Sequence, residues 1–412
     1  MTSTMAALLA PGDVLVAGQA LAEPETLLDR LFGDLNDTAG LRLFSGMSLT
    51  SAPGRVPPDV ELLSFVGLGS NAALLASGRL GLLPCHMSDL SRILTSGPLQ
   101  ADVALVLVSP PNHDGFCSLG AGTDYMWPVT SRARVILAEV NSHVPFIKGD
   151  TAIAFERLDQ VVYSERPLPE YGRRAPSATE TAIAQRIVPH IRNGTCLQIG
   201  VGKLGEAILA SLGQHSDLGV HAGMVGDTIL ELMRDGVVTN SKKSIDHGLT
   251  VAGSLLASQA GVHLAAQSPS LRLRSIDHTH DPAIISQLSD FLCINSAIEV
   301  DLFGQVNSEV VGGRYIGAVG GSVDFLRGAT RSPGGRSIVA LPSTAAGGAS
   351  SRVVPRVQHV TALGSDVDII VTEFGTAELR GVSQGERARR IIDLAAPHHR
   401  DPLRAAAAEM GL

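Results

Sequence analysis

Three glycines near the middle of the chain have the spacing of a phosphate-binding turn. Gly200, Gly202 and Gly205 form the pattern G-x-G-x-x-G, between a predicted strand over 195–199 and a predicted helix over 206–212. Glycines at such a turn let backbone N–H groups approach a phosphate, and a helix N-terminus favours negative charge. The alternative is a plain tight turn that binds no ligand.

A dinucleotide-binding fold would require a second feature that this chain lacks. That fold places an acidic residue about 20 residues after the glycines, at the end of the following strand. Here the following strand, predicted over 218–221, ends at His221, and Asp217 lies at its start. A phosphate-bearing ligand of another kind is therefore favoured over a dinucleotide.

A second group of glycines precedes an acidic and an aromatic residue. Gly317, Gly320 and Gly321 are followed by Asp324 and Phe325. Closely spaced glycines can hold backbone N–H groups toward a developing oxyanion. A glycine-rich hairpin or loop without chemistry explains the pattern equally well.

The stretch 217–227 (DLGVHAGMVGD) leads from the end of a strand into a helix predicted over 225–234. Such a junction is where α/β folds place their chemistry. His221 could act there as a general base. A lone histidine at a strand end is, however, more often a structural hydrogen-bonding residue.

The elements that must position these residues are short and apolar. Residues 103–108 (VALVLV) and 135–140 (VILAEV) predict strands buried on both faces, and 338–341 and 369–372 predict two more. Strands of this kind belong to sheets covered by helices on each side, which indicates an α/β fold.

A change of composition predicts the domain boundary. Charges and prolines gather between Asp150 and Ser177, and this stretch is the best linker candidate. Ser177 and Glu180 then have the spacing of a capping box, which predicts the start of a helix, and Pro189 predicts its kink or early end. We therefore expect an N-terminal domain over 1–175 and a C-terminal domain over 176–412.

The bulk composition excludes several classes of protein. The net charge is −8 at pH 7 and no run of Lys and Arg stands out, which argues against nucleic acid as a partner. The histidines and cysteines show no metal-ligand spacing, so no metal is expected. No apolar run is long enough to span a membrane, and the N-terminus lacks the features of a signal peptide, so we expect a cytoplasmic protein.

Taken together, the motifs resemble those of the acetyl-CoA hydrolase/transferase family, which includes 4-hydroxybutyrate and propionate CoA-transferases. The matching stretches cover nearly the whole chain in order: SPPNHDGFCSLG (109–120), AEVNSHVPFIKGD (138–150), LQIGVG (197–202), DLGVHAGM (217–224), INSAIEVDLFGQVN (294–307), GAVGGSVDFLRGA (317–329), IVALPST (338–344) and VTEFGTAELRG (371–381).

The resemblance implies two similar open α/β domains, of the CoA-transferase or NagB/RpiA-like kind, with the active site at the cleft between them. It implies that coenzyme A or an acyl-CoA binds as substrate, with no permanently bound cofactor, and that a small carboxylic acid or another acceptor takes the acyl group or the CoA. Family members commonly self-associate, so a homo-oligomer is expected. The resemblance places CoA against two segments, namely Gly200, Val201, Gly202 and Lys203, and the loop with Gly317, Gly320 and Gly321.

The family's catalytic position differs in this chain. Transferases of the family that this chain resembles carry a glutamate in a His-(Thr/Ser)-Glu-Met motif. The carboxylate of this glutamate attacks the thioester and then carries CoA as a glutamyl thioester. This chain reads His221-Ala222-Gly223-Met224, so Gly223 occupies the place of the glutamate. Removing the covalent nucleophile of a hydrolase can cost a factor of about 10⁶ in rate.

Three hypotheses follow from this replacement. In the first, the protein processes thioesters without a glutamyl intermediate, by hydrolysis or direct acyl transfer, with His221 as base. In the second, a substitute carboxylate such as Asp227 or Glu299 restores conventional CoA transfer. In the third, the protein is a non-catalytic CoA-binding or partner subunit. The acyl group cannot be read from the sequence.

Overall fold

The structure is a computed structural model that describes residues 4–35, 40–173 and 175–412. Contacts divide the chain into two compact units. Unit 1 comprises Met1–Gly172, Gly223–Leu230 and Val251–Thr279, and unit 2 comprises Arg173–Ala222, Glu231–Thr250 and His280–Leu412. Both units are of the α/β kind, as the apolar runs predicted.

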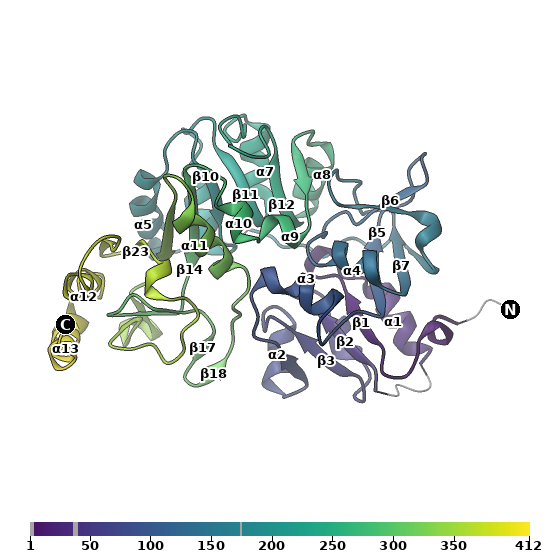
Figure 1. Cartoon of the computed structure of the whole chain (residues 1–412), viewed down its shortest axis with the longest axis horizontal. Coiled ribbons are helices and arrows are strands. Elements are labelled where there is room, and N and C mark those ends of the chain that lie inside the picture. Colours follow the sequence, from purple (N-terminus) through teal and green to yellow (C-terminus); the bar gives the residue numbers. More distant parts are fainter. Residues whose placement is uncertain (1–3, 36–39, 174) are drawn as a thin grey trace. The chain divides into compact units, whose positions relative to one another are not determined.

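Unit 1 is built on a seven-stranded sheet in which all neighbouring strands are parallel (Figure 1). In order across the sheet the strands are β4 (Leu80–Leu82), β3 (Glu61–Ser64), β2 (Arg42–Ser45), β1 (Val14–Ala17), β5 (Val103–Val108), β7 (Val135–Asn141) and β9 (Gln160–Ser164). Its helices are α1 (Glu25–Gly33), α2 (Asn71–Ala76), α3 (Met87–Thr95) and α4 (Met126–Arg132). The central strands β5 and β7 are buried along their whole length, as expected for a parallel sheet covered on both faces.

Further elements of unit 1 lie in its later segments and outside the main sheet. They are the antiparallel pair β6 (Phe116–Ser118) and β8 (Ala152–Ala154), the strands β12 (Thr250–Leu255) and β13 (Leu271–Leu273), and the helices α8 (Gln259–Gln267) and α9 (Ile276–Thr279). Strand β11 (Gly219–Val225) and helix α7 (Asp227–Arg234) each belong to both units.

Unit 2 contains a second sheet, whose strands run in the order β11, β10, β14, β19, β23, β24. Their bounds are β10 (Cys196–Ile199), β14 (Phe291–Ser296), β19 (Arg336–Ala340), β23 (Ile369–Thr372) and β24 (Gly375–Glu378). All neighbours are parallel except β23 and β24. The helices are α5 (Ala178–Ile187), α6 (Lys203–Ala210), α10 (Pro282–Ile285), α11 (Ser322–Arg331), α12 (Gln384–Ile392) and α13 (Pro397–Glu409).

The start of unit 2 confirms the predicted helix signals. Ser177 caps α5, because its hydroxyl accepts from the Glu180 amide (3.3 Å) while the Glu180 carboxylate accepts from the Ser177 amide (2.7 Å). The helix ends at Ile187, two residues before Pro189, and continues only as a short 3-10 turn.

The linker prediction was too wide. Strands β8 and β9 lie inside 150–177, and β9 pairs with β7 along five residues. The charges and prolines that suggested a linker lie before and after β9, which itself carries no charged residue and is the edge strand of its sheet. The division at 175 and 176 stays a prediction, since the compact units are built from discontinuous segments.

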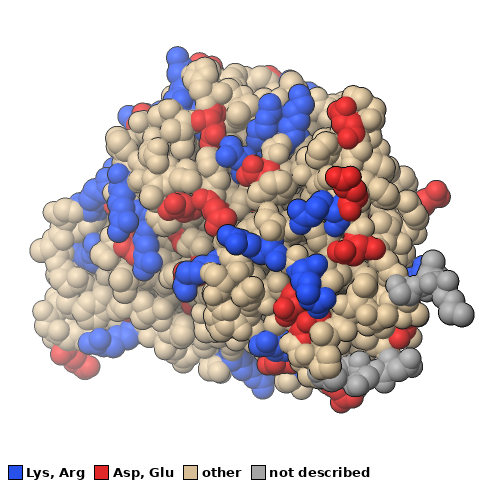
Figure 2. Space-filling view, turned by 45° about the vertical axis from the view of Figure 1, so that its right-hand side comes forward, with Lys and Arg blue, Asp and Glu red and all other residues tan. Residues whose placement is uncertain are grey.

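Acidic and basic side chains are interspersed on the face shown in Figure 2. Positive and negative charges therefore lie close to one another on this face, as expected from the absence of a basic run in the sequence. Among the described residues, none of the helices combines the length and the apolar character needed to cross a bilayer.

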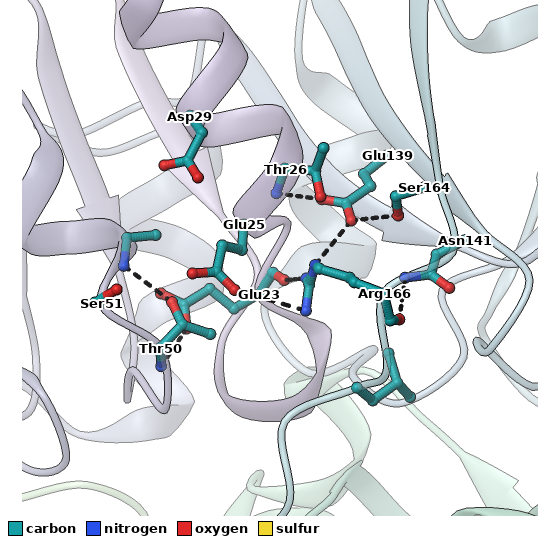
Figure 3. A network of polar contacts seen from close by, with 12 residues as sticks. Glu23, Glu25, Thr26, Asp29, Thr50, Ser51, Glu139, Asn141, Ser164 and Arg166 are labelled. Atoms are coloured by element: carbon teal, nitrogen blue, oxygen red, sulfur yellow. Dashed lines mark hydrogen bonds and ion pairs between the residues drawn. The ribbon is translucent and has the colours of Figure 1, made fainter.

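A buried acidic network in unit 1 shows how the fold satisfies carboxylates that carry no chemistry (Figure 3). Glu139 of β7 is fully buried, and its oxygens accept from the amide of Thr26 (2.9 Å), the hydroxyl of Ser164 (2.6 Å) and Nε of Arg166 (3.0 Å). The carboxylate thus faces the positive N-terminus of α1 and a guanidinium. These contacts neutralise and satisfy the buried carboxylate.

Candidate functional site

The first candidate segment is the turn between β10 and α6. The helix begins at Lys203, three residues earlier than predicted, with Gly202 as its N-cap. Gly202 has φ 125° and ψ −178°, a conformation available essentially to glycine alone. Because the N-cap is a glycine, it supplies no side-chain cap, which suits the start of the helix to an anion.

The other two positions of the pattern favour glycine because of the space around them. A Cβ on Gly205 would lie 2.2 Å from the carbonyl oxygen of Gly200, so this glycine lets α6 pack directly against the turn. A Cβ on Gly200 would lie 3.3 Å from Oδ1 of Asn295, which is tight but not impossible. Val201 is about half exposed (51%), so the tip of the turn is accessible.

A pair of buried side-chain amides joins the two strands next to this turn. Gln198 of β10 and Asn295 of β14 exchange two hydrogen bonds, from Gln198 Nε2 to Asn295 Oδ1 (3.2 Å) and from Asn295 Nδ2 to Gln198 Oε1 (3.0 Å). Both side chains are buried. Because each is the other's partner, the pair fixes two neighbouring strands against each other where they end. The sequence analysis missed this role, although Gln198 stands in the motif itself.

The second candidate segment is the glycine loop 317–321, which leads into α11. The amides of Ile316 and Gly317 both donate to the carbonyl oxygen of Glu309 (2.7 and 3.0 Å), which anchors the start of the loop. A Cβ on Gly317 would lie 2.0 Å from the Ser308 carbonyl oxygen, so no larger residue fits there.

The end of the loop is shaped by two more glycines and a histidine. Gly320 has φ +53°, and Gly321 is the N-cap of α11, again without a side-chain cap. A Cβ on Gly321 would lie 2.5 Å from the ring of His280, which also packs against Phe325. Burial lowers the pKa of His280 to about 3, so this ring is neutral at pH 7.

The topology of unit 2 puts both segments at one edge of its sheet. The turn follows the carboxyl end of β10, and α11 leads back to β19, which is parallel to β14 and β10. The N-termini of α6 and α11 therefore lie on the side of the sheet where the parallel strands end. This is the edge where open α/β sheets bind their ligands, and we call it the carboxyl edge.

Glu299 lies in β15 (Glu299–Asp301), directly after β14 and thus on the carboxyl edge. Its side chain is partly exposed, and Oε2 accepts from Nδ2 of Asn307 (3.2 Å). The same amide nitrogen donates to the carbonyl of Val310 (2.7 Å), while Oδ1 of Asn307 accepts from the amide of Glu309 (3.0 Å). Asn307 thereby links Glu299 to the segment that anchors the glycine loop.

The prediction that His221 lies at a strand end is wrong. His221 lies inside β11, which continues four residues beyond it. Its side chain is fully buried, and its ring meets that of Phe291 edge to face at 6.4 Å. A carboxylate oxygen of Asp246 lies within 4.8 Å of a ring nitrogen. These surroundings favour a structural role over that of a base open to solvent.

Asp227 is the first residue of α7 and is engaged within unit 1. Its carboxylate accepts from the amide of Ser258 (3.2 Å) and from the Ser258 hydroxyl (2.9 Å). Ser258 is the N-cap of α8, so Asp227 ties the start of one helix to the start of another. This acid has little freedom to act as a nucleophile.

Gly223 is the fifth residue of β11 and is partly exposed. The sequence analysis placed this position in a loop between a strand and a helix. The strand continues through it, so Ala222 and Gly223 adopt extended backbone despite their low strand propensity.

Comparisons with known proteins agree with this architecture. Residues 10–169 match the model of the acetyl-CoA hydrolase/transferase N-terminal domain, and residues 259–407 match that of the C-terminal domain. The 4-hydroxybutyrate coenzyme A transferase of Clostridium kluyveri is 34% identical over 396 residues, covering 94% of this chain and 92% of that protein. An acetyl-CoA hydrolase of Neurospora crassa is 27% identical, covering 79% and 70%.

Two solved structures are similar over nearly the full length. RipA from Yersinia pestis has a TM-score of 0.93 at 33% identity, covering 99% of this chain and 97% of that one. A 4-hydroxybutyrate CoA-transferase from Porphyromonas gingivalis has a TM-score of 0.81 at 30% identity, covering 98% and 95%. This chain belongs to the acetyl-CoA hydrolase/transferase family.

Proposed function

We propose that the protein processes acyl-CoA thioesters without a glutamyl-CoA intermediate, by hydrolysis or by direct transfer of the acyl group to a small carboxylic acid or another acceptor. The observation that carries this proposal is Gly223, which offers no side chain at the position where the family resemblance expects a glutamate. In this reaction the oxygen of water or of the acceptor bonds to the thioester carbonyl carbon, the C–S bond breaks, and CoA leaves as the thiolate, which takes up the proton that the attacking group gives up. Water gives the free acid, and a carboxylic acid acceptor gives a mixed anhydride.

The carboxyl edge of unit 2 supplies the groups that such a reaction needs. The uncapped start of α6 suits the phosphates of CoA, with Lys203 adding a positive charge. The amides at the start of α11 suit the oxyanion that forms on the carbonyl carbon. We assign His221 a structural role in this proposal because its side chain is fully buried.

Thiol release from acyl-CoAs of different chain length tests the proposal, measured with and without carboxylate acceptors. We expect release that obeys sequential rather than ping-pong kinetics. Absence of release from every acyl-CoA, with CoA still bound in calorimetry, would support a non-catalytic CoA-binding protein instead.

A gain-of-function variant sharpens the test. Gly223→Glu should introduce ping-pong kinetics and an adduct that borohydride reduces, because it returns a carboxylate to the family's catalytic position. Gly213→Glu is the control, since a Cβ on Gly213 meets open space and the residue lies outside every candidate segment. Equal behaviour of the two variants would contradict the assigned role of position 223.

One observation favours a second candidate function, conventional CoA transfer through Glu299. Asp227 is engaged by Ser258, whereas Glu299 is partly exposed at the carboxyl edge. If Glu299 is the substitute nucleophile, borohydride treatment after incubation with acyl-CoA should tag its peptide in mass spectrometry. An untagged peptide in a preparation that releases thiol would exclude this route.

A further inference from the structure

An exposed histidine of unit 2 is in contact with a buried carboxylate. Nε2 of His359 lies 3.3 Å from Oε1 of Glu309, and both residues belong to unit 2. The histidine side chain is 44% exposed, whereas that of the glutamate is 1% exposed. A buried acid in contact with an accessible imidazole is the arrangement in which a carboxylate orients a base. The sequence analysis selected neither residue, because they are far apart in the chain.

The second oxygen of the same carboxylate is also occupied. Tyr315 donates a hydrogen bond from its hydroxyl to Oε2 of Glu309. The rings of Tyr315 and His359 meet edge to face at 6.2 Å. A buried carboxylate is unfavourable unless it is hydrogen-bonded or paired, and these two side chains meet that need. Glu309 therefore has one oxygen for the tyrosine and one for the imidazole, which fixes both rings.

Backbone contacts hold the segment that carries the histidine. The amide of Val357 donates to Oδ2 of Asp301 (3.2 Å), and the amide of Thr361 donates to the carbonyl oxygen of Val306 (2.7 Å). These two contacts flank His359 in the chain. The imidazole is therefore carried by a segment that is fixed to the residues following β14, at the carboxyl edge.

Glu309 also belongs to the backbone that anchors the glycine loop 317–321. Its carbonyl oxygen accepts from the amides of Ile316 and Gly317 (2.7 and 3.0 Å). One residue thus holds the imidazole through its side chain and the start of the loop through its main chain. Hydrolysis of a thioester needs a base for the attacking water and donors for the oxyanion, and Glu309 is linked to candidates for both.

The contact with Glu309 also decides which ring nitrogen of His359 is available. An ionised carboxylate only accepts hydrogen bonds, so the nitrogen that faces it carries the proton. In the neutral ring the lone pair is then on Nδ1, which is the atom that can take up a proton. The exposure of the ring gives water access to it.

We propose that His359 is the general base for thioester hydrolysis and that Glu309 positions it. This inference rests on the proposed function and deepens it, because it names water as the acceptor. Nδ1 of His359 takes a proton from water while the water oxygen bonds to the carbonyl carbon of the thioester. The C–S bond breaks, and the imidazolium gives the proton to the departing CoA thiolate. The products are the free carboxylic acid and CoA, and the neutral imidazole is restored.

A second histidine of the chain offers a matched control. Nε2 of His113 lies 3.4 Å from Oδ2 of Asp114, a distance close to that of the first pair. Here, however, both side chains are exposed (89% and 64%), and the acid is the next residue in the chain. The two histidines therefore share an acidic partner but differ in the burial of that partner.

Thiol release from acyl-CoA in water, without an added acceptor, tests the inference. His359→Gln should lower kcat by about 100-fold or more, within the range that general bases contribute. The KM for acyl-CoA should change by less than about threefold, and CoA should still bind in calorimetry, which excludes a folding defect. His113→Gln should keep the kcat of the wild type.

The positioning role of Glu309 requires readouts that a purely structural role would not change. Nitrogen NMR spectra of the histidine side chains should place the proton of neutral His359 on Nε2 in the wild type, and Glu309→Gln should lose this preference. The same variant should lower kcat by about tenfold or more, because the imidazole is no longer held in the reactive tautomer. Added imidazole should restore part of the kcat of His359→Ala, because it supplies a base in solution.

The outcomes separate this inference from the proposed function. An unchanged kcat in His359→Gln, or a proton on Nδ1 in the neutral wild-type ring, would overturn the inference and leave the proposed function standing. A wild-type protein that binds CoA but releases no thiol from any acyl-CoA would overturn both.

Discussion

The two edges of the unit 2 sheet present different polar groups. At the carboxyl edge the donors are backbone amides at the uncapped starts of α6 and α11, made accessible by glycines. At the amino edge, where the parallel strands begin, the donors are guanidinium groups on Arg192, Arg336 and Arg380, each of them paired with an acid. Backbone donors are fixed by the fold, whereas side-chain donors are held by acids that can be protonated.

Because of this difference, we expect the two edges to be sensitive to different substitutions. The carboxyl edge depends on backbone conformation, so it should fail when a glycine gains a side chain. The amino edge depends on charge, so it should respond to salt and to neutralising substitutions. The predictions below test this contrast, starting with the largest expected effect.

The largest effect is expected from Gly202→Ala. A Cβ there meets no atom within 4 Å, so the substitution adds only backbone strain at φ 125°. Strain of about 1–3 kcal/mol should weaken CoA binding by about 5- to 150-fold in calorimetry. Gly213→Ala, which also meets open space but has no positive φ, should bind CoA normally. Normal CoA binding by Gly202→Ala would remove the turn from the carboxyl-edge site.

A smaller effect is expected from Glu299→Gln at the same edge. If turnover does not pass through a carboxylate, the amide keeps most of the contacts and thioester turnover should change by less than about tenfold. The control is Glu409→Gln, an exposed residue near the end of α13. A loss of about 10⁴-fold or more in Glu299→Gln alone would instead establish Glu299 as the nucleophile.

The smallest effect concerns the ion pair at the amino edge. Arg336 beside Glu378 holds the pKa of that carboxyl below its ordinary value of 4.5. Because the folded pKa is lowered, the stabilisation is present above the unfolded value and is lost as pH falls through the folded pKa. An NMR titration should show Glu378 moving back toward 4.5 in Arg336→Gln. An unchanged pKa would mean that the pair does not form in solution.

Much of the scaffold could be predicted from local patterns. The run 103–108 became β5 with the same bounds, and the capping box at Ser177 began α5 as expected. These predictions depend on a continuous apolar run or on a side chain that reaches three residues along the chain. Local physics is sufficient in such cases.

The candidate site was predicted less completely, for a physical reason. The glycine segments were found because their residue types alone indicate a special backbone. The extension of β11 through Gly223 was missed, because the local preference of Ala222 and Gly223 favours a loop and does not decide the backbone here. The amide pair of Gln198 and Asn295 was missed because its members are 97 residues apart.

The sequence by itself determined the α/β class, the family, the glycine turns and the absence of a glutamate at position 223. Only the tertiary structure decided what each acid and base does. It engaged Asp227 with Ser258, buried His221 against Phe291, and brought arginines from three separate segments around one cavity. The reason is that conformational preferences act between neighbours in the chain, whereas burial and charge pairing depend on residues that only folding brings together.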